Sequence, residues 1–304
     1  MQRNARSGRW FLPPSRFRGD PGPGLYSPAM PELPEVETVR RQLAPWLTGR
    51  TIARVELLAP PGPKYAGLER AAGQSIESVG RRGKFLLMPL SGGDELVAHL
   101  GMTGVLTPGG AAEPPKHLRV AVDLEGDTPN RLEFNDPRRF GRFLVVKRGD
   151  YGALPTLAAL GPEPLDEAFT AERFHAALSR SRVAVKTYLL SQRPVAGVGN
   201  IYADEALGRV GIHPLTPSAQ VKRKQAGQLL EAIRDVLSAS IEAQGTTLSD
   251  YRTVYGESGD YADRLDVYGR AGRACPRCGG LLERTVVGQR GTTYCPDCQR
   301  RPRP

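Results

Sequence analysis

The stretch YSPAMPELPEVETVRRQLAPW, residues 26–46, separates a Pro- and Gly-rich preamble from a helical pattern. Pro34 suits a first helical turn, and Gly49 gives a stop signal after the pattern ends. The apolar residues between them recur at the spacing of a helix; they are Val36, Val39, Leu43 and Leu47. This spacing predicts a helix over residues 33–48, at the front of the folded protein.

The preamble, residues 1–29, has the composition of a segment that does not fold. It contains five Pro and four Gly, and five Arg against a single Asp, with no apolar period. An Arg-rich, acid-poor composition is also typical of transit peptides, but Pro and Gly oppose the amphipathic helix that such peptides need. We interpret residues 1–29 as disordered, or as an extension produced by a mis-assigned translation start upstream of Met30.

From residue 50 to residue 148 the pattern changes to strands. The segments are rich in β-forming residues and are interrupted by Gly, Pro or Asp. They read RTIARVELL (50–58), SIESVGRRGKFLLMPL (75–90), DELVAHLGMTGVLTP (94–108), KHLRVAVDLEG (116–126) and RLEFNDPRRFGRFLVVK (131–147). Strands at this regular spacing indicate a β-sandwich or a barrel, and together with the leading helix they predict one domain over residues 30–150.

A segment punctuated by Pro and Gly, residues 151–165, follows as a linker. Helical spacing then returns from about residue 170 to residue 245, in TAERFHAALSR, VAVKTYLLSQ, GNIYADEALGRVG and SAQVKRKQAGQLLEAIRDVLSASIEA. Residues 246–268 are polar, aromatic and interrupted by Gly, which predicts a mobile loop. Residues 166–268 are therefore expected to form a helical domain that ends in this loop, and the chain is expected to be an α+β multidomain protein.

The last segment, residues 269–304, contains all four cysteines of the chain. In CPRCGGLLERTVVGQRGTTYCPDC, two C-x2-C pairs are separated by sixteen residues. Each pair forms a tight knuckle, and two knuckles on a short β-hairpin complete a tetrahedral shell of four thiolates. Such a shell favours one structural zinc ion, because no coordination position stays open; a redox dithiol or chance spacing is the alternative. The predicted ligands are Cys275, Cys278, Cys295 and Cys298.

The net charge of +10 is confined to the two ends of the chain. Residues 1–29 carry +4 and residues 269–304 carry +6, whereas the middle holds 29 basic and 29 acidic residues. A basic tail on a neutral body indicates either a polyanionic partner or a solubilising charge run. No apolar run approaches the ~20 residues of a membrane span, and no secretory signal is evident. We expect a monomeric, cytoplasmic protein without a membrane partner.

MPELPEVETVRR, residues 30–41, closely resembles the start of formamidopyrimidine-DNA glycosylases, the Fpg branch of the Fpg/Nei family of base-excision repair enzymes. Further segments resemble motifs of that family, in the family's order. They are RRGKFLL (81–87), HLGMTG (99–104), NDPRRFG (135–141), LGPEPL (160–165), VAGVGNIYADEAL (195–207), GTTL (245–248) and the cysteine hairpin. The resemblance implies an N-terminal β-sandwich with a flanking helix, a helical helix–two-turns–helix domain and a zinc ribbon.

The resemblance also implies a covalent mechanism that begins at Pro31. In the family, the α-amine of a proline exposed by removal of the initiator Met attacks C1′ of the damaged nucleotide and expels the base. The resulting iminium draws electrons, so that elimination cleaves the strand. Inside a peptide bond the Pro31 nitrogen is an amide whose delocalised lone pair does not attack, so we expect the working protein to begin at Pro31. Glu32 matches the family's proton donor, and Lys84 and Arg290 match residues implied in β- and δ-elimination.

Each of these residues also has a plainer interpretation. Glu32 could cap the first helix. Glu35 also matches the family pattern but is a weaker candidate for a site residue than Glu32, and it could lie on the helix surface. Lys84 and Arg290 could be ordinary surface charges. The sequence by itself leaves these alternatives open.

A glycosylase acting on duplex DNA flips its target base out of the stack and must fill the gap. By resemblance Met102, Arg138 and Phe140 do so, because an apolar wedge and a ring replace stacking and a guanidinium binds the orphaned base. Alternatively, the apolar pair belongs to the core and the arginines form ion pairs. The phosphate contacts implied by position are His117, Arg139, Arg182 and Asn200. The glycines of VAGVGN would bring backbone N–H groups to a phosphate, and the loop 246–268 would contact the extruded base.

Taken together, the resemblance implies a bifunctional DNA glycosylase and abasic-site lyase acting on damaged double-stranded DNA. Its expected substrates are the oxidised purines 8-oxoguanine and formamidopyrimidines, with strand cleavage by β,δ-elimination. One alternative is an endonuclease VIII-like glycosylase for oxidised pyrimidines, although the opening PELPEVE resembles the Fpg version. The other is a zinc-ribbon DNA-binding protein without catalysis.

Overall fold

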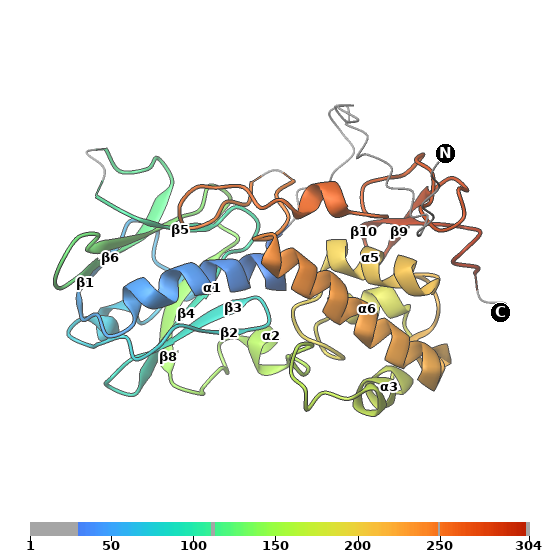
Figure 1. The fold of residues 1–304 in the computed structure, drawn as a ribbon. Coiled ribbons are helices and arrows are strands. Elements are labelled where there is room, and N and C mark those ends of the chain that lie inside the picture. Colours follow the sequence, from blue (N-terminus) through green and yellow to red (C-terminus); the bar gives the residue numbers. More distant parts are fainter. Residues whose placement is uncertain (1–29, 111–112, 249, 302–304) are drawn as a thin grey trace, which may run out of the picture.

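The computed structural model describes residues 30–110, 113–248 and 250–301 of the chain. Figure 1 shows two bodies side by side, one built from strands and the other from helices. Helix α1 (Leu33–Leu47) extends across the first body toward the second. The expectation for residues 1–29 lies outside the described residues.

Two four-stranded antiparallel sheets form the first body. One sheet has the strand order β1 (Ile52–Leu57), β6 (Leu118–Leu124), β7 (Arg131–Asn135) and β5 (Val105–Pro108). The other has the order β2 (Gly80–Arg82), β3 (Phe85–Pro89), β4 (Asp94–His99) and β8 (Arg142–Lys147). The predicted β-sandwich with a flanking helix is confirmed, and among the described strands no hydrogen-bonded ladder joins the two sheets into a barrel.

The inner faces of both sheets share one apolar core with α1. Phe134 of β7 stacks on Phe143 of β8 with ring centroids 5.6 Å apart, which joins the two sheets directly. The predicted apolar face of α1 packs on this core through Val36, Val39, Leu43 and Leu47. Two short 3-10 turns, η1 (Pro63–Tyr65) and η2 (Leu68–Ala71), add buried residues to it.

The second body has a core of its own. After the short helix α2 (Pro155–Ala158) come α3 (Ala171–Ser179), α4 (Val185–Leu190), α5 (Asn200–Val210), the 3-10 turn η3 (Ser218–Gln220) and α6 (Arg223–Glu242). Helix α6 packs against α3, α5 and the start of α1, as Figure 1 shows. Leu33, the first residue of α1, is buried in this second core, so α1 belongs to both bodies.

Residues 246–268 lead from α6 to the carboxyl-terminal hairpin. Their described part contains one 3-10 turn, η4 (Tyr261–Arg264), and is otherwise irregular, as the prediction of a loop requires. Tyr251 and Val254 are buried in the sandwich core, and the Val254 N–H donates to Gln42 Oε1 at 2.9 Å. The loop therefore crosses back from the helical body to the sandwich and packs against α1.

The predicted hairpin is formed by β9 (Glu283–Val287) and β10 (Arg290–Tyr294). Helix α5 packs against β10, which places the hairpin at the end of the helical body (Figure 1). Among the described helices, none combines the length and the apolar character that crossing a membrane would need.

Candidate active site

A cavity of about 140 Å³ lies where the two bodies and the hairpin meet. Its walls come from the start of α1, the turn between β2 and β3, the turn after β4, the start of α5 and the hairpin turn. Each of these segments contributes one residue that the sequence analysis singled out: Glu32, Lys84, Met102, Asn200 and Arg290. Residues far apart in the sequence therefore share one cavity.

The Glu32 carboxylate joins the two bodies. It stands at the N-cap position of α1, yet its side chain reaches α5. Oε2 accepts a hydrogen bond from the Gly199 N–H at 2.6 Å, and Oε1 accepts one from the Ile201 N–H at 2.8 Å. These donors belong to the first turn of α5 and have no carbonyl partner within that helix. Burial raises the pKa of Glu32 to about 7, although Lys84 and the two N–H groups act in the opposite direction.

Gly199 has no room for a side chain. A Cβ at this position would lie 2.3 Å from Glu32 Cδ and 2.5 Å from Lys84 Nζ. A Cβ at Gly197 would lie 2.4 Å from Leu33 Cδ1. The N–H groups of these two glycines bind within the protein, Gly199 to Glu32 and Gly197 to Gln192 Oε1 at 2.7 Å. The glycines serve the contact between the bodies. The expected approach of backbone N–H groups of this segment to a phosphate stays a prediction.

Glu35 is buried, so the helix-surface alternative is wrong. Its Oε1 accepts hydrogen bonds from the Tyr202 hydroxyl at 2.6 Å and the Thr246 N–H at 2.7 Å, and its Oε2 accepts one from the Glu32 N–H at 2.8 Å. Burial raises the pKa of Glu35, and these hydrogen bonds oppose that shift. Because Thr246 begins the loop after α6, Glu35 ties the base of this loop to the start of α1.

Lys84 follows Gly83 at the turn between β2 and β3 and is 7% exposed, which excludes the interpretation as a surface charge. Burial lowers the pKa of its ammonium group. The carboxylates of Glu32 and Glu35 oppose this shift, and the charge of Arg290 adds to it. A lysine in this setting gives up a proton more readily than one in water.

Pro31 is buried directly before Glu32. Its nitrogen is joined to Met30, and Met30 lines the cavity. Pro31 itself is not among the residues that line the cavity, so its link to the cavity runs through its neighbours Met30 and Glu32. In this form the Pro31 nitrogen is an amide.

Arg290 enters the cavity from the first residue of β10, and a buried ion pair that the sequence analysis missed holds this strand. Lys186 Nζ lies 2.6 Å from Asp204 Oδ1, with side chains 0% and 1% exposed. Lys186 also donates to Thr292 Oγ1 at 2.7 Å, and Asp204 Oδ2 accepts from the Thr293 N–H at 3.0 Å. The available signal was a lysine inside the apolar run VAVKTYLL.

Asn200 connects the same two elements. Its Nδ2 donates to the Gly291 carbonyl at 3.1 Å. Its Oδ1 is buried and accepts no hydrogen bond from the described residues. The start of α5 is thus held by Glu32 on one side and by the hairpin on the other.

The segments HLGMTG and NDPRRFG form two turns that touch. A Cβ at Gly101 would lie 2.5 Å from the Gly141 nitrogen. Asp136, which is 0% exposed, accepts hydrogen bonds from the Thr103 hydroxyl at 2.7 Å and the Gly141 N–H at 2.8 Å. Asp136 was not among the predicted site residues, although it stands inside the motif. It fixes the turn that carries Met102, which is half-buried at the cavity wall.

Arg138 and Phe140 project from the second of these turns. Phe140 is 50% exposed, so the alternative of a core residue is wrong. The Arg138 guanidinium carbon lies 5.0 Å from the Phe140 ring centroid, a cation–π contact. Between them Arg139 has a φ of 56°, a left-handed conformation uncommon for a residue with a side chain.

His117, Arg139 and Arg182 are not part of the cavity wall. Arg139 and Arg182 are exposed, and His117 is half-buried just before β6. The structure places them on the surface and does not join them to the cavity residues. Their expected contacts with phosphates remain predictions.

The four cysteines form one cluster. Their Sγ atoms all lie within 4.8 Å of one another, and the Cys278–Cys295 and Cys275–Cys298 pairs are 3.5 and 4.0 Å apart. Four sulfurs at ~2.3 Å from a tetrahedral zinc ion would be separated by about 3.8 Å, so the cluster fits zinc. The zinc ion would hold the two knuckles of the hairpin together and leave no open position for catalysis.

Three family models match the chain. They are the formamidopyrimidine-DNA glycosylase N-terminal domain over residues 30–143, the formamidopyrimidine-DNA glycosylase H2TH domain over residues 160–252, and the zinc finger found in FPG and IleRS over residues 272–301. The chain belongs to the formamidopyrimidine-DNA glycosylase (Fpg) family. This confirms the resemblance, the fold class and the zinc ribbon predicted from the sequence.

Known Fpg proteins match nearly the whole described chain. A formamidopyrimidine-DNA glycosylase of Thermus thermophilus is 50% identical over 272 residues, which cover 89% of this chain and 98% of that protein. A crystal structure of the MutM (Fpg) protein from Thermus thermophilus matches with a TM-score of 0.80 at 49% identity, over 88% of this chain and 98% of that chain. A mutant of Lactococcus lactis Fpg, solved in complex with Fapy-dG containing DNA, matches with a TM-score of 0.80 at 33% identity, over 89% of this chain and 100% of that chain.

Replacing Gly199 by Ala tests the packing of this Fpg site. The added methyl group meets the buried Glu32 and Lys84, so we expect the free energy of unfolding to fall by about 1–3 kcal/mol in chemical denaturation. Gly62→Ala is the matched control, because its φ of 171° is extended backbone and no atom lies within 4 Å of a Cβ there. Equal effects at the two positions would contradict the described packing.

Removing one cysteine tests the zinc site. The unaltered protein should contain one zinc ion per chain, and Cys278→Ser should lose it, as measured by elemental analysis. Because the hairpin core consists of little more than Cys275, Leu282 and Cys295, metal loss should unfold the hairpin while the sandwich keeps its structure. Full zinc content in Cys278→Ser, or an unchanged hairpin after chelation, would count against this assignment.

Proposed function

We propose that this protein is a bifunctional DNA glycosylase and abasic-site lyase of base-excision repair. Its substrates are oxidised purines, 8-oxoguanine and formamidopyrimidines, in double-stranded DNA. The observation that carries the proposal is the convergence of Glu32, Lys84, Asn200 and Arg290 on one cavity beside Pro31, in a member of the Fpg family.

The nucleophile is the amine of Pro31 after the Met30–Pro31 bond is cleaved. Met30 lines the cavity and Pro31 is its buried neighbour, so removal of Met30 opens the cavity toward that nitrogen. The neutral amine attacks C1′, and the electron pair of the bond between C1′ and the base leaves with the base. The neighbouring charge of Lys84 favours the neutral form of the amine.

Glu32 supplies the proton that this step needs. Its pKa of about 7 lets a large fraction of the carboxyl groups carry a proton near neutral pH. That proton goes to the sugar ring oxygen or, by relay, to the departing base. The hydrogen bonds from Gly199 and Ile201 keep the carboxyl in one position throughout.

Lys84 and Arg290 act in the elimination steps. The nitrogen bonded to C1′ loses its proton, and its lone pair forms the iminium as the C1′–O4′ bond opens and the ring oxygen takes up a proton. Loss of a proton from C2′ then pushes electrons toward C3′, and the phosphate on C3′ leaves. A second elimination releases the other phosphate. Lys84 serves the first step and Arg290 serves the second, both from positions on the cavity wall.

The DNA lies across the exposed turns. Met102 enters the gap left by the flipped nucleotide, and Arg138 and Phe140 hold the orphaned partner. The exposed Phe140 ring and the stacked Arg138 guanidinium support this role. The phosphate contacts are His117, Arg139, Arg182 and Asn200, with the loop 246–268 on the extruded base.

Borohydride trapping on DNA that contains an abasic site tests the mechanism. A chain beginning at Pro31 should form a covalent adduct, because only then is the nitrogen a free amine. Pro31→Gly should lose most of this trapping, whereas Pro60→Gly, an exposed control, should keep it. Undiminished trapping by a chain that still carries Met30 on Pro31 would contradict the mechanism.

Base release and trapping by the chain that begins at Pro31 distinguish the three candidate functions. An Fpg-type enzyme releases 8-oxoguanine faster than thymine glycol, and an endonuclease VIII-like enzyme shows the reverse order. A zinc-ribbon protein without catalysis never traps. Either of these last two results would overturn the proposal.

The raised pKa of Glu32 predicts a pH dependence. Because the protonated carboxyl is the active form, single-turnover base release should fall as the pH rises through about 7, where Glu32 loses its proton. Glu32→Gln should release the base about 100-fold more slowly and should lack this descending limb. If base release by Glu32→Gln still falls with the same midpoint pH, a group other than Glu32 causes the pH dependence.

A further inference from the structure

Two turns that carry site residues lie on either side of the segment that joins the two bodies, residues 160–163. One is the turn between β2 and β3, which ends in Lys84. The other is the stretch 192–199, which ends where α5 begins. The joining segment contacts both turns, and its contact with the first runs through Glu163.

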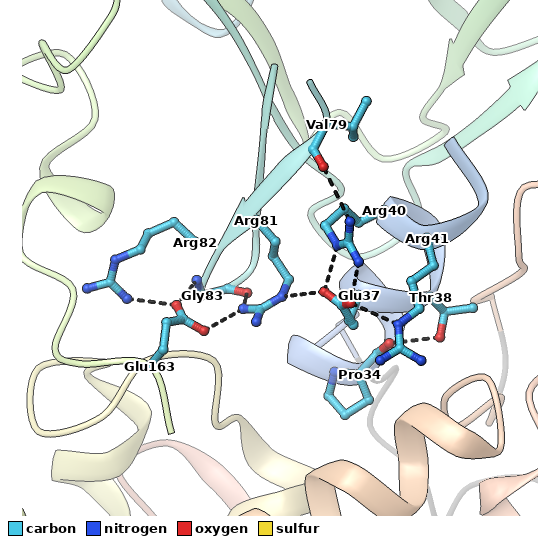
Figure 2. A network of polar contacts seen from close by, with 10 residues as sticks. All are labelled: Pro34, Glu37, Thr38, Arg40, Arg41, Val79, Arg81, Arg82, Gly83 and Glu163. Carbon is cyan, nitrogen blue, oxygen red and sulfur yellow. Dashed lines mark hydrogen bonds and ion pairs between the residues drawn. The ribbon is translucent and has the colours of Figure 1, made fainter. Parts of the chain in front are cut away.

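Glu163 binds the β2–β3 turn with both carboxylate oxygens. Oε1 accepts hydrogen bonds from the Gly83 N–H and from Arg82 Nη1, both at 2.7 Å, and Oε2 accepts one from Arg81 Nη1 at 2.7 Å. Figure 2 shows the carboxylate between the two arginines, facing the backbone of Gly83. Burial would raise the pKa of Glu163, but the Arg81 charge and these hydrogen bonds hold it below its usual value, so the group is ionised.

Arg81 extends this contact to α1. Its Nε donates to Glu37 Oε2 at 3.1 Å, and its Nη1 donates to the Gly83 carbonyl at 3.0 Å. Glu37 also accepts from Arg40 and Arg41 of its own helix, as Figure 2 shows. The turn before Lys84 is therefore fixed to the helix that begins beside Glu32.

Backbone hydrogen bonds fix the joining segment to the other turn. The Gly161 N–H donates to the Gln192 carbonyl at 2.8 Å, and the Ala196 N–H donates to the Pro162 carbonyl at 2.9 Å. A Cβ at Gly161 would lie 2.2 Å from the Arg193 carbonyl oxygen, so the two backbones touch.

Close packing completes the connection. Gly83 has a φ of 55°, and a Cβ there would lie 3.0 Å from Leu160 Cδ1. Arg82 Nη2 donates to the carbonyls of Leu160 and Gly161. Gly83, which precedes Lys84, is thus held in three ways: its N–H binds Glu163, its carbonyl binds Arg81, and Leu160 packs where a side chain would stand.

We propose that residues 160–163 act as a spacer that sets the position of Lys84 relative to the start of α5, with Glu163 as the positioning residue. This inference rests on the proposed function, because it assumes that Lys84 serves the reaction. Glu163 does not touch the substrate and acts through Gly83. A displacement of about 1 Å in a catalytic group can lower a rate by about 100-fold, so loss of Glu163 should be measurable.

A double-mutant cycle between Glu163 and Lys84 tests this. In a chain beginning at Pro31, Glu163→Ala should slow single-turnover strand cleavage at an abasic site, the step assigned to Lys84, by at least about 10-fold, while the Kd for DNA changes by less than about 3-fold. In a Lys84→Ala background the same change should slow cleavage by less than about 2-fold, because the group to be positioned is already absent. Glu163→Gln keeps an oxygen for the Gly83 N–H and should recover part of the rate; it replaces Glu163→Ala in the cycle if that variant does not fold.

Asp94→Ala is the matched control. Asp94 is a buried carboxylate at the start of β4 in the sandwich, paired with Arg70 at 2.8 Å and Lys147 at 2.9 Å, and it is not part of the cavity wall. It should lower the melting temperature as Glu163→Ala does, without a comparable loss of strand cleavage. Equal losses of cleavage in the two variants, or the same factor for Glu163 with and without Lys84, would overturn the inference while the chain beginning at Pro31 still traps. If the chain beginning at Pro31 fails to trap, the proposed function falls and this inference falls with it.

Discussion

The hydrogen bonds of the Glu32 carboxylate to the N–H groups of Gly199 and Ile201 are the interaction on which the rest of the structure depends. They cross from the first residues of α1 to a helix 167 and 169 residues further along the chain. An ionised carboxylate buried without such donors would cost several kcal/mol, and the first turn of α5 would lose its partners. Because Pro31 directly precedes Glu32, the same bonds also decide where the Pro31 nitrogen lies.

Three other groups of the cavity, Arg290, Met102 and Lys84, are held by residues that do not themselves line the cavity. The Lys186–Asp204 ion pair holds the strand of Arg290, and Asp136 holds the turn of Met102. Residues 160–163 hold the turn of Lys84 through Gly83. These side chains thus stand in turns or at the start of a strand, and polar contacts behind them hold those segments in place.

The sequence predicted the features that depend on local pattern. The helix after Pro34, the strands of the sandwich and the two cysteine knuckles follow from spacing, and they appear in the structure as expected. The pairing of Glu32 with α5 does not follow from spacing, since it is a contact between two bodies. Lys186 gave one signal, a lysine inside an apolar run, whereas Glu163 gave none stronger than that of a surface charge. Only tertiary structure shows that Lys186 is buried against Asp204 and that Glu163 pairs with Arg81. The partners of the glycines before α5 also depend on tertiary structure: the N–H groups of Gly197 and Gly199 bind Gln192 and Glu32.

The central claim is that the Pro31 nitrogen, placed by Glu32, bonds to C1′ of the damaged nucleotide. Tandem mass spectrometry of the proteolysed, borohydride-reduced adduct tests it most directly. We predict a single modified peptide whose added mass lies on Pro31 at its amino terminus. An adduct carried by Lys84, or by a peptide in which Pro31 still follows Met30, would contradict the account.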